Sequence, residues 1–120
     1  MKFRQFLTKN GTEILVGKDA QNNEDLIKQV EEKEIVLHTS KPGSPFVNIK
    51  GKARRGDVKK AATICAHYSQ DWKKNKNDVL IHKFKGKDIY KEKGMKKGCF
   101  GIKKFKAIKV KKKWIEECQG

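Results

Sequence analysis

The longest helical pattern in the chain is DVKKAATICAHYSQDW, residues 57–72. Its apolar side chains recur at the spacing of an α-helix and therefore form a single stripe along one side. They are Val58, Ala61, Ala62, Cys65, Tyr68 and Trp72. The stripe begins with small residues, which lets the first turns lie close against a sheet, and Asp57 is a suitable N-cap. The pattern predicts one long helix that packs on a sheet.

Short strand patterns lie on both sides of this helix. They occur at residues 3–8, 13–18, 35–40, 46–50, 79–81, 89–90, 100–102 and 105–110. An Asn-Gly turn at residues 10–11 joins the first two patterns into a predicted β-hairpin. Pro42 and Gly43 mark a turn between the next two. Capping side chains and carboxylates at residues 22–25 predict a short helix between the two strand pairs.

This order of elements predicts the α+β fold class. We expect a mixed, mostly antiparallel sheet with one long and one short helix. The length of 120 residues fits a single domain rather than two. Residues 1–115 are expected to form this domain and residues 116–120 a C-terminal tail.

The charge balance is strongly basic. The chain has 30 Lys and Arg against 14 Asp and Glu, a formal net charge of +16. Residues 1–60 contain 13 basic and 8 acidic side chains, and residues 61–120 contain 17 and 6. Such a surplus sets up a positive surface potential that attracts polyanions and repels cationic partners. We therefore expect nucleic acid as the partner, with contacts concentrated in the second half of the chain.

Several other classes of protein are disfavoured by the sequence. No apolar run approaches the roughly 18 residues that a membrane span needs, so no transmembrane segment is predicted. The three Cys residues are widely spaced without a Cys-x-x-Cys motif, and no apolar signal region follows the N-terminus. These features favour a reducing compartment, and we expect a cytoplasmic protein.

Enzyme motifs are also missing. Residues 51–56 have the Gly spacing of a phosphate loop, but Asp57 and Val58 stand where Lys and Ser or Thr are needed. Cys65 and His67 are two residues apart on the predicted helix and so point in different directions, which predicts a core thiol and a solvent-facing imidazole rather than a metal site. We expect no catalytic residue, no metal, no cofactor and no small-molecule substrate. A nuclease is disfavoured because carboxylates are not clustered.

Lysine is the dominant residue of the C-terminal part. Residues 83–113 contain fourteen Lys against only Asp88 and Glu92. Lysines alternate with apolar residues at residues 104–106 and 109–111, which predicts that one face of the C-terminal sheet is a lysine surface. The alternative is that these lysines only keep the protein soluble.

A second basic cluster, Lys50, Lys52, Arg54 and Arg55, leads into the start of the long helix. Helix N-termini have free N–H groups and Arg forks fit phosphate, so this loop is a candidate phosphate clamp, or else merely a mobile loop. His38 ends a strand beside the Pro-Gly-Ser turn and could reach a base or sugar, although a structural role is the stronger alternative. We expect Trp72 and Phe46 to be core residues, and the lack of exposed aromatic residues then predicts weak sequence preference.

The predicted nucleic-acid contacts combine these clusters. They are His38, Lys41, Ser44, Lys50, Lys52, Arg54, Arg55, Lys85, Lys87, Lys103, Lys104, Lys106, Lys109 and Lys111. Charge alone does not distinguish RNA from DNA, and a basic adaptor for an acidic protein or an anionic membrane surface is a further alternative.

Six short motifs occur in a fixed order along the chain. They are residues 13–18 with 22–26, residues 34–38 with 42–44, Ala61, Ala62, Ala66, Tyr68 and Ser69, and Val79 with residues 89–91 and 97–98. Taken in this order, they resemble the NFACT-R domain, which lies toward the C-terminus of the NFACT proteins of ribosome-associated quality control and also occurs as a short standalone protein. Two positions depart from the family pattern: Val36 replaces a Trp, and Pro45 replaces a His.

The resemblance implies a binding module, because the catalytic-looking motifs of the N-terminal domain of long NFACT proteins have no counterpart here. It implies RNA as the partner, either tRNA or rRNA and possibly the large ribosomal subunit, during C-terminal tailing of stalled peptides. Together with the charge, it predicts an RNA-binding domain that holds phosphates with little reading of bases.

Overall fold

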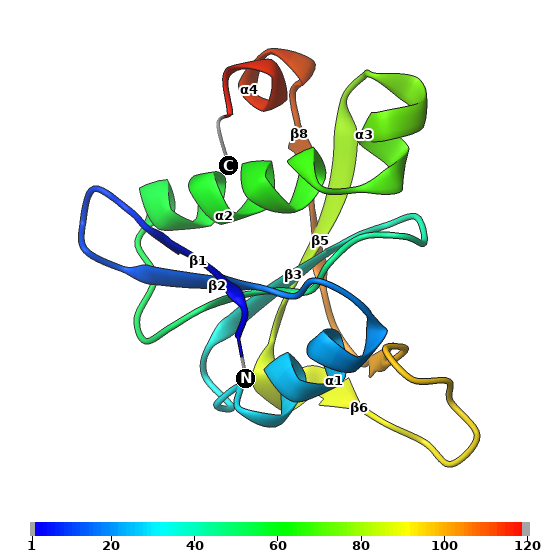
Figure 1. The fold of residues 1–120 in the computed structure, drawn as a ribbon. Helices are drawn as coiled ribbons and strands as arrows, with labels where there is room; N and C mark the ends of the chain where they lie inside the picture. The colour runs from blue at the N-terminus through cyan, green and yellow to red at the C-terminus, as the bar shows by residue number, and fades with distance from the viewer. Residues whose placement is uncertain (1, 119–120) are drawn as a thin grey trace.

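The computed structural model describes residues 2–118 (Figure 1). In chain order the elements are β1 (Arg4–Leu7), β2 (Glu13–Val16), α1 (Ala20–Lys28), β3 (Ile35–Thr39), β4 (Val47–Ile49), α2 (Arg55–His67), α3 (Gln70–Asn75), β5 (Val79–Lys85), the 3₁₀ turn η1 (Gly86–Asp88), β6 (Ile89–Tyr90), β7 (Gly101–Ile102), β8 (Lys106–Val110) and α4 (Lys112–Glu117). Six strands form one sheet in the order β1-β2-β4-β3-β5-β8, and β6 pairs with β7. All of these strand pairs are antiparallel. The predicted α+β class is confirmed.

The sheet separates two apolar layers. On one side lies α2 (Figure 1), and its Ala61, Ala62 and Cys65 pack against Leu37, Val47 and other strand residues. The small helix residues allow the close approach that the sequence predicted. On the other side lies α1, whose fully buried Leu26 belongs to a second cluster with Leu15, Val36, Phe46 and Phe84.

The predicted hairpin is confirmed at the N-terminus. β1 and β2 pair from Arg4 opposite Val16 to Leu7 opposite Glu13. Gly11 lies in the turn at φ +81°, a conformation that a residue without a side chain adopts at no steric cost. The hairpin edge therefore follows from local sequence alone.

The single long helix predicted for residues 57–72 is wrong at both ends. Helix α2 begins at Arg55 with Arg54 as the N-cap, so Asp57 lies inside its first turn. The helix ends at His67, and the Ser69 hydroxyl accepts a hydrogen bond from the Trp72 N–H to start α3. Ser is favoured at helix N-caps and is neutral to unfavourable inside a helix, because its hydroxyl competes for backbone hydrogen bonds. Trp72 is nevertheless buried, as predicted.

One further boundary differs from the expectations. Helix α1 starts after Asp19, whose carboxylate accepts from the Asn22 N–H at 2.8 Å, so the cap lies before the predicted residues 22–25. Helix α4 spans Lys112–Glu117, and the division into a domain of residues 1–115 and a tail of residues 116–120 stays a prediction. Residues 119–120 of that tail lie outside the described residues. Within residues 2–118, no helix has both the length and the apolar character needed to cross a membrane.

Asp57 joins the hairpin to the start of α2. Its side chain is fully buried and accepts hydrogen bonds from the Arg54 N–H at 2.9 Å, the Thr12 hydroxyl at 2.9 Å and the Asn10 amide at 3.2 Å. Hydrogen bonds from the Arg54 N–H and from the Thr8, Thr12 and Asn10 side chains outweigh the effect of burial and lower the pKa of Asp57 to about 2.

This lowered pKa predicts how stability depends on pH. The ionised Asp57 stabilises the fold fully above the ordinary carboxyl pKa near 4, and this contribution is lost as the pH falls toward the folded-state pKa of about 2. We expect Asp57→Asn to lower Tm by several degrees at neutral pH and the difference from wild type to shrink between about pH 4 and pH 2. Thermal melts across this range measure it. The control is Asp25→Asn, which also neutralises a carboxylate but at an oxygen that accepts an exposed hydrogen bond from the Gln21 amide and can still accept it as Asn. A Tm difference for Asp57→Asn that does not change with pH would contradict this assignment.

Candidate nucleic-acid interface

Strands β5 and β8 bring lysines from two parts of the sequence together. Their register places Lys83 opposite Lys106 and Ile81 opposite Ile108. Residues that face each other across antiparallel strands share one side of the sheet. Ile81 and Ile108 pack in the cluster beneath α2, so Lys83 and Lys106 extend along the same side of the sheet.

The predicted single lysine face of this strand is wrong. Alternation along β8 puts Lys106 on the side of Ile108 and Val110, and it puts Lys109 on the other side, opposite Leu80. The two lysine patterns of the sequence are out of phase because both Ala107 and Ile108 lie between Lys106 and Lys109. In addition, the strand covers only Lys106–Val110, with Lys103 and Lys104 before it and Lys112 at the start of α4.

The lysines instead line a groove of about 680 Å³ at the end of β5, η1 and the bend before β8. We call it the basic groove. Its lining residues are Ile35, Lys83, Phe84, Lys85, Lys87, Asp88, Lys103, Lys104, Phe105 and Lys106. Six cations thus surround one carboxylate. Among residues 2–118 the ion pairs join Lys41 to Asp71, Lys50 to Glu34 and Lys91 to Glu24. The six groove lysines therefore have no acidic partner within this part of the chain.

Backbone contacts hold the two walls of the basic groove in place. The Lys103 N–H donates to the Asp88 carbonyl at 2.8 Å, which ties the bend before β8 to η1. The Gly86 N–H donates to the Glu34 carbonyl at 2.9 Å. A side chain at Gly86 would collide with the Glu31 carbonyl and with Val30. The glycine therefore lets η1 approach the segment before β3.

A neighbouring hollow of about 420 Å³ extends the groove toward α2. It is bounded by Arg55, Val58, Lys59, Ala62, Lys83, Ile108, Lys109, Val110 and Trp114. Lys83 lines both hollows. The Lys59 ammonium lies 4.2 Å from the centre of the Trp114 ring, a cation–π contact with an uncharged side chain. The structure thus brings Arg55 together with the C-terminal lysines, whereas Lys52 and Arg54 are exposed and line neither hollow.

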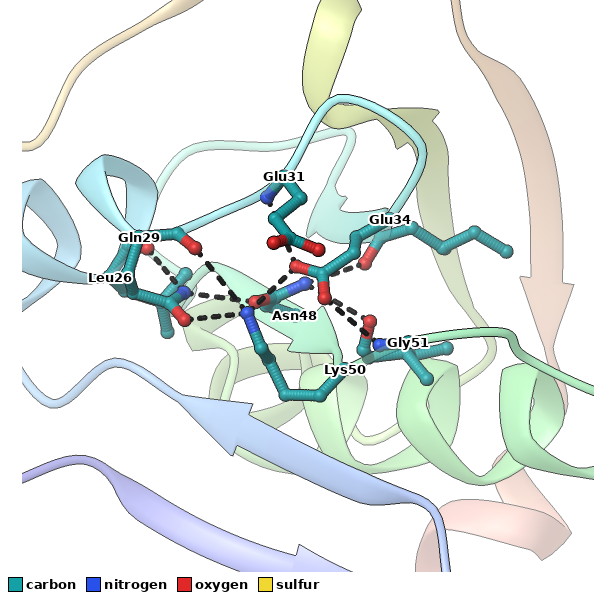
Figure 2. A network of polar contacts seen from close by, with 9 residues as sticks. Leu26, Gln29, Glu31, Glu34, Asn48, Lys50 and Gly51 are labelled. Carbon is teal, nitrogen blue, oxygen red and sulfur yellow. Dashed lines mark hydrogen bonds and ion pairs between the residues drawn. The ribbon is translucent and has the colours of Figure 1, made fainter.

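Lys50 has a structural role that sequence reasoning did not predict. Figure 2 shows its ammonium between Gln29 and Glu34, donating to Gln29 Oε1 at 2.7 Å and to Glu34 Oε1 at 2.8 Å. The other Glu34 oxygen accepts from the Gly51 N–H at 2.9 Å. The positive charge of Lys50 is therefore already compensated by Glu34, which argues against Lys50 as an RNA contact.

The network around Lys50 extends into the sheet. Gln29 donates to Asn48 Oδ1 at 2.9 Å, and Asn48 on β4 is fully buried (Figure 2). Glu34 is only 4 % exposed. Burial raises its pKa, but hydrogen bonds from the Gly51 N–H and from Lys50 outweigh burial, and the pKa is lowered. The carboxylate therefore remains ionised at neutral pH.

His38, Lys41 and Ser44 lie away from the basic groove. The His38 Nδ1 bonds to the Thr39 carbonyl at 2.8 Å, and its ring centroid lies 4.5 Å from that of Phe46. Burial lowers the His38 pKa, so the ring is neutral at pH 7. The Ser44 hydroxyl accepts from the Thr39 N–H and donates to the Pro45 carbonyl, each at 3.1 Å. Both side chains thus stabilise the turn between β3 and β4, in agreement with the structural alternative for His38. Lys41 is exposed and pairs with Asp71.

The predicted core position of Cys65 is confirmed, whereas the predicted solvent-facing position of His67 is wrong. Cys65 is fully buried, and burial raises its thiol pKa to about 12. His67 is half-buried rather than solvent-facing, because its ring packs edge-on against Tyr68 at 5.0 Å. Residues 2–118 contain no group of three or more His, Cys, Asp or Glu that could hold a metal ion.

A second basic cleft, of about 330 Å³, lies on another part of the surface. Its cations are Arg4, Lys18, Lys73 and Lys97. They lie around Gly17, Gly43, Ser44 and Gly98, so several of the motifs that resemble the NFACT-R domain meet here. Arg4 stacks on Tyr68 with its guanidinium 4.5 Å from the ring centre. Sequence reasoning missed this cleft because its cations come from four separate segments.

The predicted contacts also omitted three residues of the basic groove and its extension, namely Lys59, Lys83 and Phe105. The alternation of Lys83 and Lys85 in the sequence could have indicated Lys83.

A basic α+β domain with a groove of uncompensated lysines has the architecture of a nucleic-acid-binding module. The chain belongs to the family described as the NFACT protein RNA binding domain, whose family model matches residues 2–104. The resemblance read from the short motifs is thereby confirmed.

Two known proteins are similar to this chain. The archaeal Rqc2 homolog aRqcH of Methanocaldococcus jannaschii is 32% identical over 102 residues, which cover 78% of this chain and 15% of that protein. The chain therefore spans a small part of the length of this relative. The C-terminal part of the fibronectin/fibrinogen-binding protein from Streptococcus suis has the same fold, with a TM-score of 0.84 and 24% identity over 92% of this chain and 45% of the other.

Proposed function

We propose that this chain is an RNA-binding module without catalytic activity of its own, and that it holds RNA phosphates in the basic groove. The observation that carries the proposal is the set of six groove lysines with no acidic partner among residues 2–118. Uncompensated lysines that line a concave surface attract phosphates and release counterions when they bind. Arg55 and Lys59 extend this surface toward the start of α2.

The RNA that we propose is tRNA or rRNA in a ribosome-associated quality control context. Membership of the NFACT RNA binding domain family supports RNA over DNA. Similarity to an archaeal Rqc2 homolog supports the ribosomal context. The proposed contacts are Arg55, Lys59, Lys83, Lys85, Lys87, Lys103, Lys104 and Lys106. Lys52, Arg54, Lys109 and Lys111 are exposed, Lys109 also lines the hollow toward α2, and all four remain proposed secondary contacts.

A salt titration of affinity tests this function. The protein is freed of bound nucleic acid, and its affinity is measured for a folded tRNA, a duplex RNA and a duplex DNA of similar length. We expect the tRNA to bind most tightly and to remain bound at about 0.15 M salt, with an affinity that falls steeply as salt rises. Equal binding to all three ligands that disappears at this salt concentration would show generic attraction to phosphate and contradict the proposal.

A further inference from the structure

Phe105 is a large apolar side chain exposed beside the groove lysines. Among residues 2–118, the large hydrophobic residues with marked exposure are Leu7, Leu80, Tyr90 and Phe105. Phe105 is 52% exposed and, unlike the other three, lines the basic groove. The expectation that exposed aromatic residues are lacking is therefore wrong. Phe105 also follows immediately after residue 104, where the family match ends.

The Phe105 ring is held by a second aromatic ring. Its centroid lies 3.9 Å from that of His82, and the two planes are 27° apart, so the rings are stacked. His82 projects from β5 opposite Ala107 of β8, two residues after Phe105. The imidazole thus supports one face of the phenyl ring. Lys104 and Lys106 flank Phe105 in the sequence, and both line the same groove.

We propose that Phe105 is a stacking platform for an unpaired RNA base whose flanking phosphates are held by the groove lysines. An aromatic side chain can stack on a base only if the base is not stacked between its neighbouring bases in a duplex, as in single strands, loops and bulges. The basic groove would therefore prefer single-stranded or loop RNA over continuous duplex. This inference rests on the proposed function and names the class of RNA that the groove selects.

The chemistry around the ring favours RNA over an apolar protein surface. The apolar residues beside Phe105 in the groove are Ile35 and the buried Phe84, and the remaining lining is charged. Protein interfaces exclude lysine from their centre, whereas single-stranded nucleic acid is bound by aromatic rings interspersed with cations.

The test compares one short RNA as a single strand and annealed to its complement, at a fixed salt concentration. The variants are Phe105→Ala, Phe105→Trp, which keeps an aromatic face, and Leu7→Ala as a control at an exposed apolar residue outside the groove. We expect Phe105→Ala to weaken single-strand binding by about tenfold and duplex binding by less than about twofold. Phe105→Trp should retain the wild-type preference, and Leu7→Ala should bind as wild type does. Fluorescence of a 2-aminopurine placed in the single strand reports base stacking directly.

The outcomes separate this inference from the proposed function. If wild type binds RNA in a salt-dependent manner but Phe105→Ala binds the single strand equally well, the platform is overturned and the proposed function stands. An equal loss on single strand and duplex also overturns the platform. If wild type binds neither RNA, the proposed function fails and the platform with it. Thermal melts confirm that each variant is folded.

Discussion

Replacing Lys85, Lys104 and Lys106 together by Gln is expected to weaken RNA binding by about 100-fold at physiological salt. Each lost phosphate contact makes the fall of log affinity with log salt less steep by about 0.9. At about 0.15 M salt this corresponds to a roughly fivefold loss of affinity for each contact. These three lysines are exposed, so their replacement should leave the fold intact. Affinity for the folded tRNA, measured over a range of salt concentrations, gives both the loss and the change in slope.

A second triple variant separates position from net charge. Lys9, Lys28 and Lys93 are exposed and lie outside the basic groove, and changing all three to Gln removes the same total charge. We expect this variant to lose only a few-fold in affinity, because charges beyond about 10 Å are largely screened at this salt concentration. Equal losses for the two triple variants would mean that RNA responds to net charge alone, and the groove would no longer be the proposed site.

Glu34→Ala is expected to lower the free energy of unfolding by about 3 kcal/mol, because removing one member of a buried ion pair leaves the other member without a partner of opposite charge. The carboxylate accepts from Lys50 at 2.8 Å, from the Gly51 N–H at 2.9 Å and from the Glu31 N–H at 3.1 Å. All three donors lose this partner in the variant. For a domain of this size, the change corresponds to a drop in Tm of roughly 10 °C. Urea denaturation and thermal melts measure it.

The matched control for Glu34→Ala is Glu32→Ala, since Glu32 is exposed and lies two residues away. We expect its stability to stay within about 0.5 kcal/mol of wild type. Equal stability of the two variants would show that the network around Glu34 does not stabilise the fold. Lys50→Gln should be destabilised as well, while its folded form binds RNA with wild-type affinity, because the Lys50 charge is directed inward to Glu34.

Local patterns in the sequence predict much of this fold. The hairpin follows from an Asn-Gly turn between two short apolar segments, and Gly11 adopts the positive φ that such a turn needs. The stripe from Val58 to Trp72 correctly identifies residues of helices α2 and α3 that pack in the core against the sheet. It does not reveal the break after His67, because Tyr68 and Trp72 remain at core positions whether or not the helix continues. The break depends on the Ser69 hydroxyl, which caps α3.

The candidate site is less predictable, because a lysine is free or paired according to residues far away in the sequence. Lys50 and Lys85 look equivalent in the sequence, yet Lys50 meets a buried carboxylate 16 residues earlier and Lys85 does not. Only the pairing of β5 with β8 places Lys83 opposite Lys106. The position of the Phe105 ring also depends on tertiary structure, since the ring stacks on His82 of β5.

Lysine acetylation footprinting tests most directly whether the basic groove holds RNA. The free protein and its complex with folded tRNA are treated briefly with an acetylating reagent, and modification at each lysine is measured by mass spectrometry. RNA in the groove should protect Lys83, Lys85, Lys87, Lys103, Lys104 and Lys106, while Lys9, Lys28 and Lys93 react as in the free protein. Protection confined to Lys18, Lys73 and Lys97 would place the RNA in the second basic cleft and contradict this account.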